Sequence, residues 1–261
     1  MYLSPCLARG SAWNQGSMAI GGDGWAFLRQ QDPSWRCTEH GDEVRDSIRR
    51  AIDACNPNGI GPIMEVNPSG LEDLLASIRA CSVCIQHLPE GPRPIVQASV
   101  SARIVIIGQA PGRRVHRSGI PWDDPSGNTL RTWLGLSDDQ FYDSALVALV
   151  PMGFCYPGSN KSGDKPPRPE CAPLWHDAVL SRLPADRLDV IIGAYAQKRY
   201  ITNRAPSLTE TVANWREHLP EQIVLPHPSP RNRHWLTKNP WFENAALPEL
   251  QSRVQEVVDS G

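Results

Sequence analysis

The chain has 261 residues, 40% of them hydrophobic, and a formal net charge of -2 at pH 7. This length accommodates one large α/β domain, or one domain with an extension. Its apolar runs stay well short of the roughly 18 residues that span a bilayer, and the first residues lack the charged start and apolar stretch of a secretory signal. We therefore expect a cytoplasmic protein without a membrane partner, and the small net charge does not by itself indicate nucleic-acid binding.

Residues 1–66 are rich in Gly, Ser, Trp and polar side chains and show little sustained hydrophobic periodicity. We predict an irregular or partly disordered N-terminal extension there. Apolar residues at helical spacing predict one helix over residues 43–55, which the turn sequence Asn56-Pro57-Asn58-Gly59 would end.

From residue 67 onward the pattern of a folded domain is clearer. Ser69 is a predicted helix N-cap, because apolar residues follow it at helical spacing: Leu71, Leu74, Leu75 and Ile78. Strands are predicted at residues 103–107, 144–150, 189–193 and 222–225, and further helices at 128–134, 170–183, 194–201, 209–217 and 239–258. Strands that alternate with helices imply a parallel sheet covered on both faces. We therefore predict an α/β domain over residues 67–261, a three-layer α/β/α sandwich with a central four-stranded parallel sheet.

The strand predicted at 103–107 runs directly into a tight turn, Gly108-Gln109-Ala110-Pro111-Gly112. Gly108 and Gly112 allow the backbone to bend and to approach a ligand closely, and Pro111 stiffens the turn. Sites in open α/β sheets form at the carboxyl ends of the strands, where this turn is expected. An ordinary strand-to-loop connection is the alternative interpretation.

The strand predicted at 222–225 ends in a second loop, Pro226-His227-Pro228-Ser229-Pro230-Arg231. Its prolines restrict the backbone around His227 before any ligand binds. Basic residues follow both loops: Arg113, Arg114, His116 and Arg117 after the first, and Arg231, Arg233, His234 and Lys238 after the second. If both loops lie on one edge of the sheet, that edge is basic; the alternative is a set of solvated loop charges.

The chain has seven cysteines, and an odd number without a secretory signal argues against a disulfide framework. Four of them have a pattern, with Cys81-x-x-Cys84 before the first predicted strand and Cys155 and Cys171 after the second, both beside prolines. Four thiolates suit a [4Fe–4S] cluster or a Cys₄ zinc site. Four unconnected cysteines are the alternative.

The two loops, the stretch Gly119-Ile120-Pro121-Trp122 and the order of the four cysteines resemble the uracil-DNA glycosylase superfamily, in particular its iron–sulfur families 4 and 5. The resemblance covers about residues 70–258. It implies a monofunctional DNA glycosylase of base excision repair, which hydrolyses the N-glycosidic bond of uracil or of related deaminated or damaged bases. It also implies a [4Fe–4S] cluster, with structural zinc as the alternative, and DNA with a flipped base as the partner. Such an enzyme is expected to be a monomer of bacterial type that associates with the nucleoid when it acts.

The resemblance also implies roles for individual residues. Gln109 would orient the attacking water, Asp123 or Asp124 would hold that water or stabilise the cationic sugar, and His227 would stabilise the departing base. Trp122 would stack on the base, since a nucleobase gains about 1–3 kcal/mol from an aromatic face; packing in the core is the alternative for Trp122, and capping of a turn is the alternative for the two aspartates. The remaining implied contacts are Ala110, Asn128, Met152 and Gly153 to the base, Gly108, Pro111, Gly112, Ser229, Pro230 and Arg231 to DNA, and Cys81, Cys84, Cys155 and Cys171 to the metal.

The sequence departs from the resembled pattern at three positions. Pro151 stands where family 4 members have an Asn that reads the uracil edge, Gln109 replaces their carboxylate, and Arg231 replaces an apolar wedge residue. Backbone groups near Met152 and Gly153, or the Asn128 side chain, could substitute for the missing Asn. These departures favour a broader range of bases, or a nucleic-acid-binding protein with weak or lost catalysis.

Overall fold

The computed structural model describes residues 18–20, 26–28, 70–161 and 163–260. The chain divides into two compact units, residues 1–65 and 66–261. In the first unit, strand β1 (Met18–Ile20) pairs in antiparallel fashion with β2 (Ala26–Leu28). The helix predicted over residues 43–55 lies outside the described residues, as does most of the predicted extension.

The second unit contains a four-stranded parallel sheet, as predicted. Its strands lie in the order β4 (Val147–Leu149), β3 (Ile104–Ile107), β7 (Leu188–Ile192) and β8 (Gln222–Leu225). The strands are short apolar runs and almost every residue in them is buried, which is typical of a parallel sheet covered on both faces.

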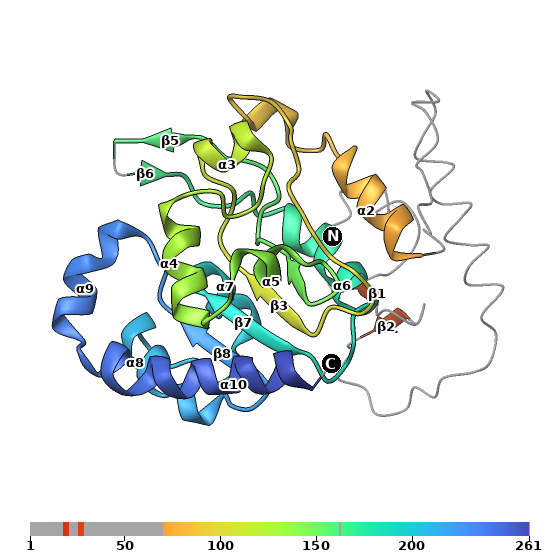
Figure 1. The fold of residues 1–261 in the computed structure, drawn as a ribbon. Helices are drawn as coiled ribbons and strands as arrows, with labels where there is room; N and C mark the ends of the chain where they lie inside the picture. Colours follow the sequence, from red (N-terminus) through yellow and green to blue (C-terminus); the bar gives the residue numbers. More distant parts are fainter. Residues whose placement is uncertain (1–17, 21–25, 29–69, 162, 261) are drawn as a thin grey trace, which may run out of the picture. The chain divides into compact units, whose positions relative to one another are not determined.

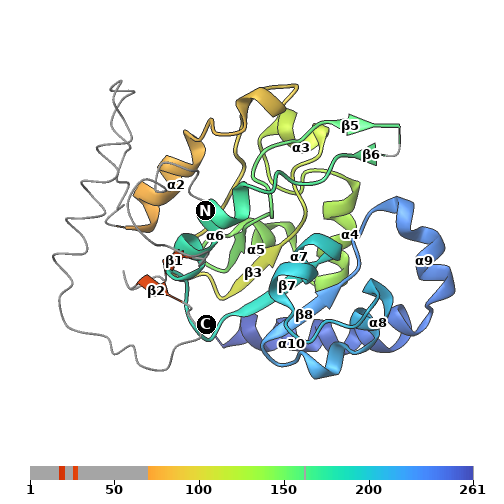
Figure 2. The same cartoon turned by 180° about the vertical axis from the view of Figure 1, so that it is seen from behind.

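Helices lie on both sides of this sheet, which confirms the three-layer α/β/α architecture (Figures 1 and 2). Helix α4 packs against α10, and α2 packs against α6. The helices are α2 (Leu71–Arg79), α3 (Arg113–Ser118), α4 (Pro125–Leu134), α5 (Asp138–Tyr142), α6 (Cys171–Leu180), α7 (Gly193–Tyr200), α8 (Leu208–Ala213), α9 (Arg233–Lys238) and α10 (Leu247–Asp259). Among the helices of the described residues, none combines the length and apolar character needed to cross a membrane.

Several local predictions need correction. Gly70, not Ser69, is the N-cap of α2. Helices α3 and α9 were not predicted, because their basic sequences carry no clear apolar stripe. The helix predicted over 239–258 is divided into a π-helical turn, Phe242–Ala246, and α10.

The long segment between β4 and α6 contains one further element that the sequence analysis read as loop. Strands β5 (Ser159–Asn160) and β6 (Gly163–Asp164) form a small antiparallel hairpin. Because all four strands of the main sheet are parallel, the segments that follow β3, β4 and β8 leave from the same edge. Both predicted loops and the segment that carries the hairpin therefore begin at the carboxyl edge of the sheet.

Candidate active site

Both loops open on one cavity of about 600 Å³ at this edge of the sheet. This volume lies in the usual range for small-molecule sites. Ten of the residues singled out in the sequence line it: Gln109, Ala110, Pro111, Gly112, Trp122, Asp124, His227, Ser229, Pro230 and Arg231. The structure thus brings together side chains that lie more than a hundred positions apart in the chain.

Trp122 joins the first loop to the second. Its backbone φ is 56°, in the left-handed region that non-glycine residues rarely adopt. The indole lies over Gly108, where an added Cβ would come within 2.6 Å of Trp122 Cζ2. The Trp122 ring centroid is 6.0 Å from that of His227, with the planes tilted by 34°. Trp122 also packs against the core, and it lines the cavity. The structure is therefore compatible with both interpretations of this residue, and stacking on a base stays a prediction.

Of the two adjacent aspartates, Asp124 is the one that lines the cavity. It is also the N-cap of α4, where its Oδ1 accepts a hydrogen bond of 2.8 Å from the backbone N–H of Gly127. Asp124 Oδ2 lies 3.8 Å from the position that a Cβ on Gly112 would take. The Asp123 carboxylate lies 3.7 Å from the Arg114 guanidinium and is not part of the cavity wall. The capping bond therefore fixes Asp124 so that its second oxygen remains on the side of the first loop.

His227 is partly buried at the end of β8. Burial lowers the pKa of its imidazole below the usual range, and the Asp124 charge opposes this shift. The backbone carbonyl of His227 accepts a hydrogen bond of 2.6 Å from Asn232 Nδ2, which fixes the second loop. At neutral pH the ring is therefore uncharged and able to donate a hydrogen bond into the cavity.

The three other residues implied to contact the base do not lie on the cavity wall. The N–H groups of Met152 and Gly153 donate to the carbonyls of Gly108 (2.9 Å) and Gln109 (3.0 Å), so they are not free to read a base edge. Asn128 is exposed on α4, where its Oδ1 accepts a hydrogen bond of 2.6 Å from Arg131. The expectation that these groups replace the missing Asn at Pro151 is therefore not supported.

Two charged residues of the cavity wall were missed by the sequence analysis, Asp164 and Lys165. Both belong to the segment that begins with the β5–β6 hairpin. Gln109 Nε2 donates to the Lys165 carbonyl at 3.4 Å, which connects the first loop to this segment. No motif marks Asp164 in the sequence; it is one of two acidic residues, with Glu170, between Cys155 and Cys171.

A buried histidine supports the wall at Pro151. His176 has no exposed surface, and its Nε2 lies 3.0 Å from the Pro151 carbonyl, which it satisfies by donating a hydrogen bond. Its Nδ1 is hydrogen-bonded to the Tyr200 hydroxyl, and the two rings stack. This chain of contacts joins α6 and α7 to the segment that follows β4.

Burial lowers the pKa of His176 from 6.5 to about 4, and this makes stability depend on pH. Between those two values the unfolded chain binds a proton that the folded protein does not bind. The free energy of unfolding is therefore expected to fall as pH decreases from 6.5, by about 1.4 kcal/mol per unit and about 3 kcal/mol in all. Urea unfolding at a series of pH values measures this slope. In His176→Gln the slope of the free energy of unfolding against pH should be smaller by about 1.4 kcal/mol per unit, the contribution of one proton. An unchanged slope in the variant would show that His176 is not the group responsible.

A second cavity is lined by the four cysteines of the predicted metal site: Cys81, Cys84, Cys155 and Cys171. Burial raises the pKa of the Cys155 thiol to about 11 and that of Cys171 to about 12. A positive metal centre would reverse this preference and favour the thiolates.

Two N–H groups border the four thiols. The Phe154 N–H donates to Cys171 Sγ at 3.3 Å, as is usual beside cluster thiolates. Trp175 also lines the cavity, and its buried indole N–H has no acceptor among the described residues. No group of three or more His, Cys, Asp or Glu side chains in the described part of the chain is arranged to hold a metal ion. The four thiols thus share a cavity, and Trp175 adds an unsatisfied donor to it.

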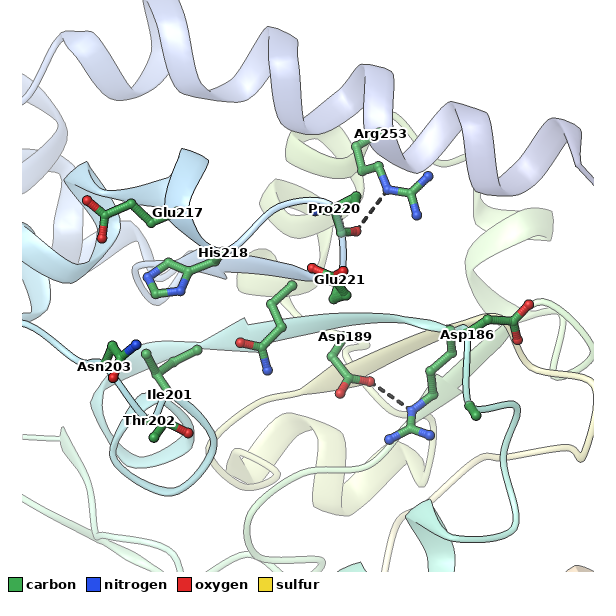
Figure 3. A pocket seen from close by; sticks show the side chains of 13 residues that line it. Asp186, Asp189, Ile201, Thr202, Asn203, Glu217, His218, Pro220, Glu221 and Arg253 are labelled. Carbon is green, nitrogen blue, oxygen red and sulfur yellow. Dashed lines mark hydrogen bonds and ion pairs between the residues drawn. The ribbon is translucent and has the colours of Figure 1, made fainter.

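A third cavity, of about 580 Å³, lies at the opposite edge of the sheet (Figure 3). It surrounds the amino ends of β7 and β8, where the Arg187 guanidinium pairs with Asp189 at 2.9 Å and Arg253 Nε donates to the Pro220 carbonyl at 2.9 Å. Neither loop reaches it. The chemistry-bearing residues of the two loops are therefore concentrated in the cavity at the carboxyl edge.

Comparison with known proteins agrees with this geometry. The family model described as "Uracil DNA glycosylase superfamily" matches residues 96–251, more than half of the chain and including both loops. The chain is also similar to the type-4 uracil-DNA glycosylase of Thermotoga maritima, with 25% identity over 163 residues, which cover 61% of this chain and 81% of that protein. The sheet, the two loops and the family match lead to one conclusion: the chain belongs to the uracil DNA glycosylase superfamily.

Proposed function

We propose that this protein is a monofunctional DNA glycosylase, which acts as a monomer on uracil or on related deaminated or damaged bases in base excision repair. The glycosylase-like domain would span residues 67–261, with residues 1–66 as an extension. The observation that carries the proposal is the single cavity on which the two loops bring together Trp122, Asp124 and His227. The type-4 uracil-DNA glycosylase similarity supports the same reaction class.

The reaction would begin when the target nucleotide is flipped out of the DNA stack into this cavity. The Trp122 face would stack on the base. Neutral His227 would donate a hydrogen bond to a base carbonyl and stabilise the negative charge that grows on the base as it leaves. Asp124 would stabilise the cationic sugar and, together with Gln109, hold water against C1′. The C1′–N bond breaks and its electron pair goes to the base; water then forms the new C1′–O bond, so no covalent nucleophile is needed.

The DNA backbone would lie across the rim of this cavity. Pro111 and Gly112 would allow close approach on one side, and Ser229, Pro230 and Arg231 would provide contacts on the other. Gly108 was also expected to contact DNA, but it lies under the Trp122 indole and does not line the cavity. Arg231 is basic, so it would contact phosphate more readily than it would wedge between bases. Binding that depends on such contacts weakens as salt concentration rises.

A panel of oligonucleotides, each with one uracil, hypoxanthine or ethenocytosine, tests the proposal. After incubation with the protein, alkali cleaves the strand wherever a base was removed. We expect excision of at least one of these bases. Tight binding to the same oligonucleotides without any excision would instead favour the nucleic-acid-binding alternative, to which Pro151 and Gln109 point.

We further propose that Cys81, Cys84, Cys155 and Cys171 hold a [4Fe–4S] cluster, with structural zinc as the alternative. When bound, the cluster would crosslink the end of α2, the segment after β4 and the start of α6. Trp175 and the Phe154 N–H would donate hydrogen bonds to its sulfur atoms.

Replacing Cys171 with Ser is expected to remove most of the bound metal and to lower the thermal unfolding midpoint, because one of four ligands is lost from a crosslink between three segments. Metal and sulfide analysis of anaerobically purified protein measures the first effect, and thermal unfolding measures the second. Cys55→Ser, outside the pattern, is the control and should retain wild-type metal content. Iron with equal sulfide supports the cluster, zinc supports the alternative, and a wild-type protein without either metal would contradict both.

A further inference from the structure

Asp164 and Asp124 converge on the same point of the first loop. Asp164 is the last residue of β6 and lines the cavity of the two loops. Its Oδ2 lies 3.3 Å from the position that a Cβ on Gly112 would take, and Asp124 Oδ2 lies 3.8 Å from the same position. Two carboxylates from separate segments therefore approach the same position beside Gly112, on the wall of the cavity that Gln109 also lines.

The two carboxylates have different surroundings. Asp124 uses Oδ1 to cap α4, which leaves one oxygen for the cavity. Asp164 is exposed as a residue, but partial burial of its carboxyl against the cavity wall raises the carboxyl pKa; Arg231 opposes this shift, Asp124 adds to it and Arg113 opposes it. A carboxylate with a raised pKa is a stronger base than an ordinary aspartate, and catalytic pairs are commonly divided in this way into a charge stabiliser and a proton acceptor.

The segment that carries Asp164 is fixed to the site. The carbonyl of the next residue, Lys165, accepts the hydrogen bond from Gln109 Nε2. The guanidinium of Arg231, from the second loop, lies against Gly163 on the other side. Both loops therefore position Asp164 next to the place where Gln109 and Asp124 would hold water.

We propose that Asp164 is the proton acceptor of the hydrolysis. This inference rests on the proposed glycosylase function. The C1′–N bond breaks and its electron pair leaves with the base; the attacking water forms its bond to C1′ and loses one proton, which Asp164 takes. Asp124 stays ionised and stabilises the sugar cation. The proton then returns to solvent or to the departed base, which restores the Asp164 carboxylate.

This role predicts a specific pH dependence. The charged groups that face Asp164 are Arg231 from the second loop, Arg113 from α3 and Asp124 at the start of α4, with Lys165 as its neighbour in the chain. Because the ionised form of Asp164 is the active one, the rate should fall as pH decreases through its raised pKa.

The test uses single-turnover excision of whichever base the wild-type protein releases, measured across pH. Asp164→Asn is expected to lower the rate at neutral pH by about 100-fold, since a general base contributes about 10²–10⁴, and to remove the Asp164 contribution to the fall in rate at acidic pH, so that the fall that remains is the one due to protonation of His227. Binding to DNA with an abasic-site analogue should be unchanged. Asp164→Glu should recover part of the rate, and Asp139→Asn, an exposed residue of α5, is the matched control that should behave as wild type.

Three results would overturn the inference. Asp164→Asn could keep the wild-type rate and acidic limb. The excision rate of the wild-type protein could show no fall at acidic pH with a midpoint above the ordinary pKa of an aspartate. This measurement needs no variant, so it tests the inference even if Asp164→Asn fails to fold. In both cases the proposed function stands. Wild-type protein that excises no base would overturn the proposed function, and this inference with it.

Discussion

Replacing His227 with Ala is expected to lower the single-turnover rate of base excision by about 10²–10³-fold, the usual cost of removing one preorganised donor at a site of developing charge. The imidazole lies on the cavity wall, with its ring centroid 6.0 Å from that of Trp122, so both rings are available to one bound base. Because burial lowers the pKa of His227, the neutral ring acts at pH 7. The variant should therefore lose rate and keep the fall in rate at acidic pH that the proposed role of Asp164 predicts.

A histidine at the opposite edge of the sheet provides the control. His218 lines the cavity of Figure 3, which neither loop reaches. His218→Ala should therefore excise the base at the wild-type rate. If His227→Ala and His218→Ala were equally active, His227 would have no role in the reaction.

Replacing Asp124 with Asn is expected to have an effect of similar size, a loss of about 10²–10³-fold in rate, because the amide cannot stabilise a cationic sugar as a carboxylate does. The fold of the Asp124→Asn variant should be unaffected. Asn is as good an N-cap as Asp, so the bond from the Gly127 N–H to the side-chain oxygen is retained. Thermal unfolding and single-turnover excision, measured on the same preparation, separate the two properties.

Asp124→Ala completes this comparison. It should lose as much rate as Asp124→Asn and in addition about 1 kcal/mol of stability, the usual cost of an N-cap. If Asp124→Asn were active and only Asp124→Ala were impaired, Asp124 would be a cap without a catalytic role.

The sheet and the positions of both loops could be predicted because they depend on short apolar runs followed by Gly and Pro. The predicted bounds of β8 agree with the structure, and β3 begins one residue later than expected. Helices α3 and α9 could not be predicted in this way. They follow the two loops, are six residues long, and depend on the loops that precede them rather than on an apolar stripe of their own.

The composition of the site was predictable only in part. The sequence did not distinguish Asp123 from Asp124, because the choice depends on the left-handed backbone at Trp122 and on the capping bond of α4. Asp164 was missed because β5 and β6 are two residues each and show no alternating pattern. The order of the cysteines was visible in the sequence, but only the fold places all four on one cavity.

The central claim is that this chain hydrolyses an N-glycosidic bond in DNA. The most direct measurement is the detection of the free base by mass spectrometry after incubation of the wild-type protein with a uracil-containing oligonucleotide, with the strand examined before and after alkali. Oligonucleotides with hypoxanthine or ethenocytosine are treated in the same way. We expect at least one of the three to yield its free base, a strand that stays intact until alkali is added, and no protein–DNA adduct after borohydride reduction. If none of the three oligonucleotides released its base, or if a strand were cut without alkali while the base remained attached, the proposed hydrolysis would be wrong.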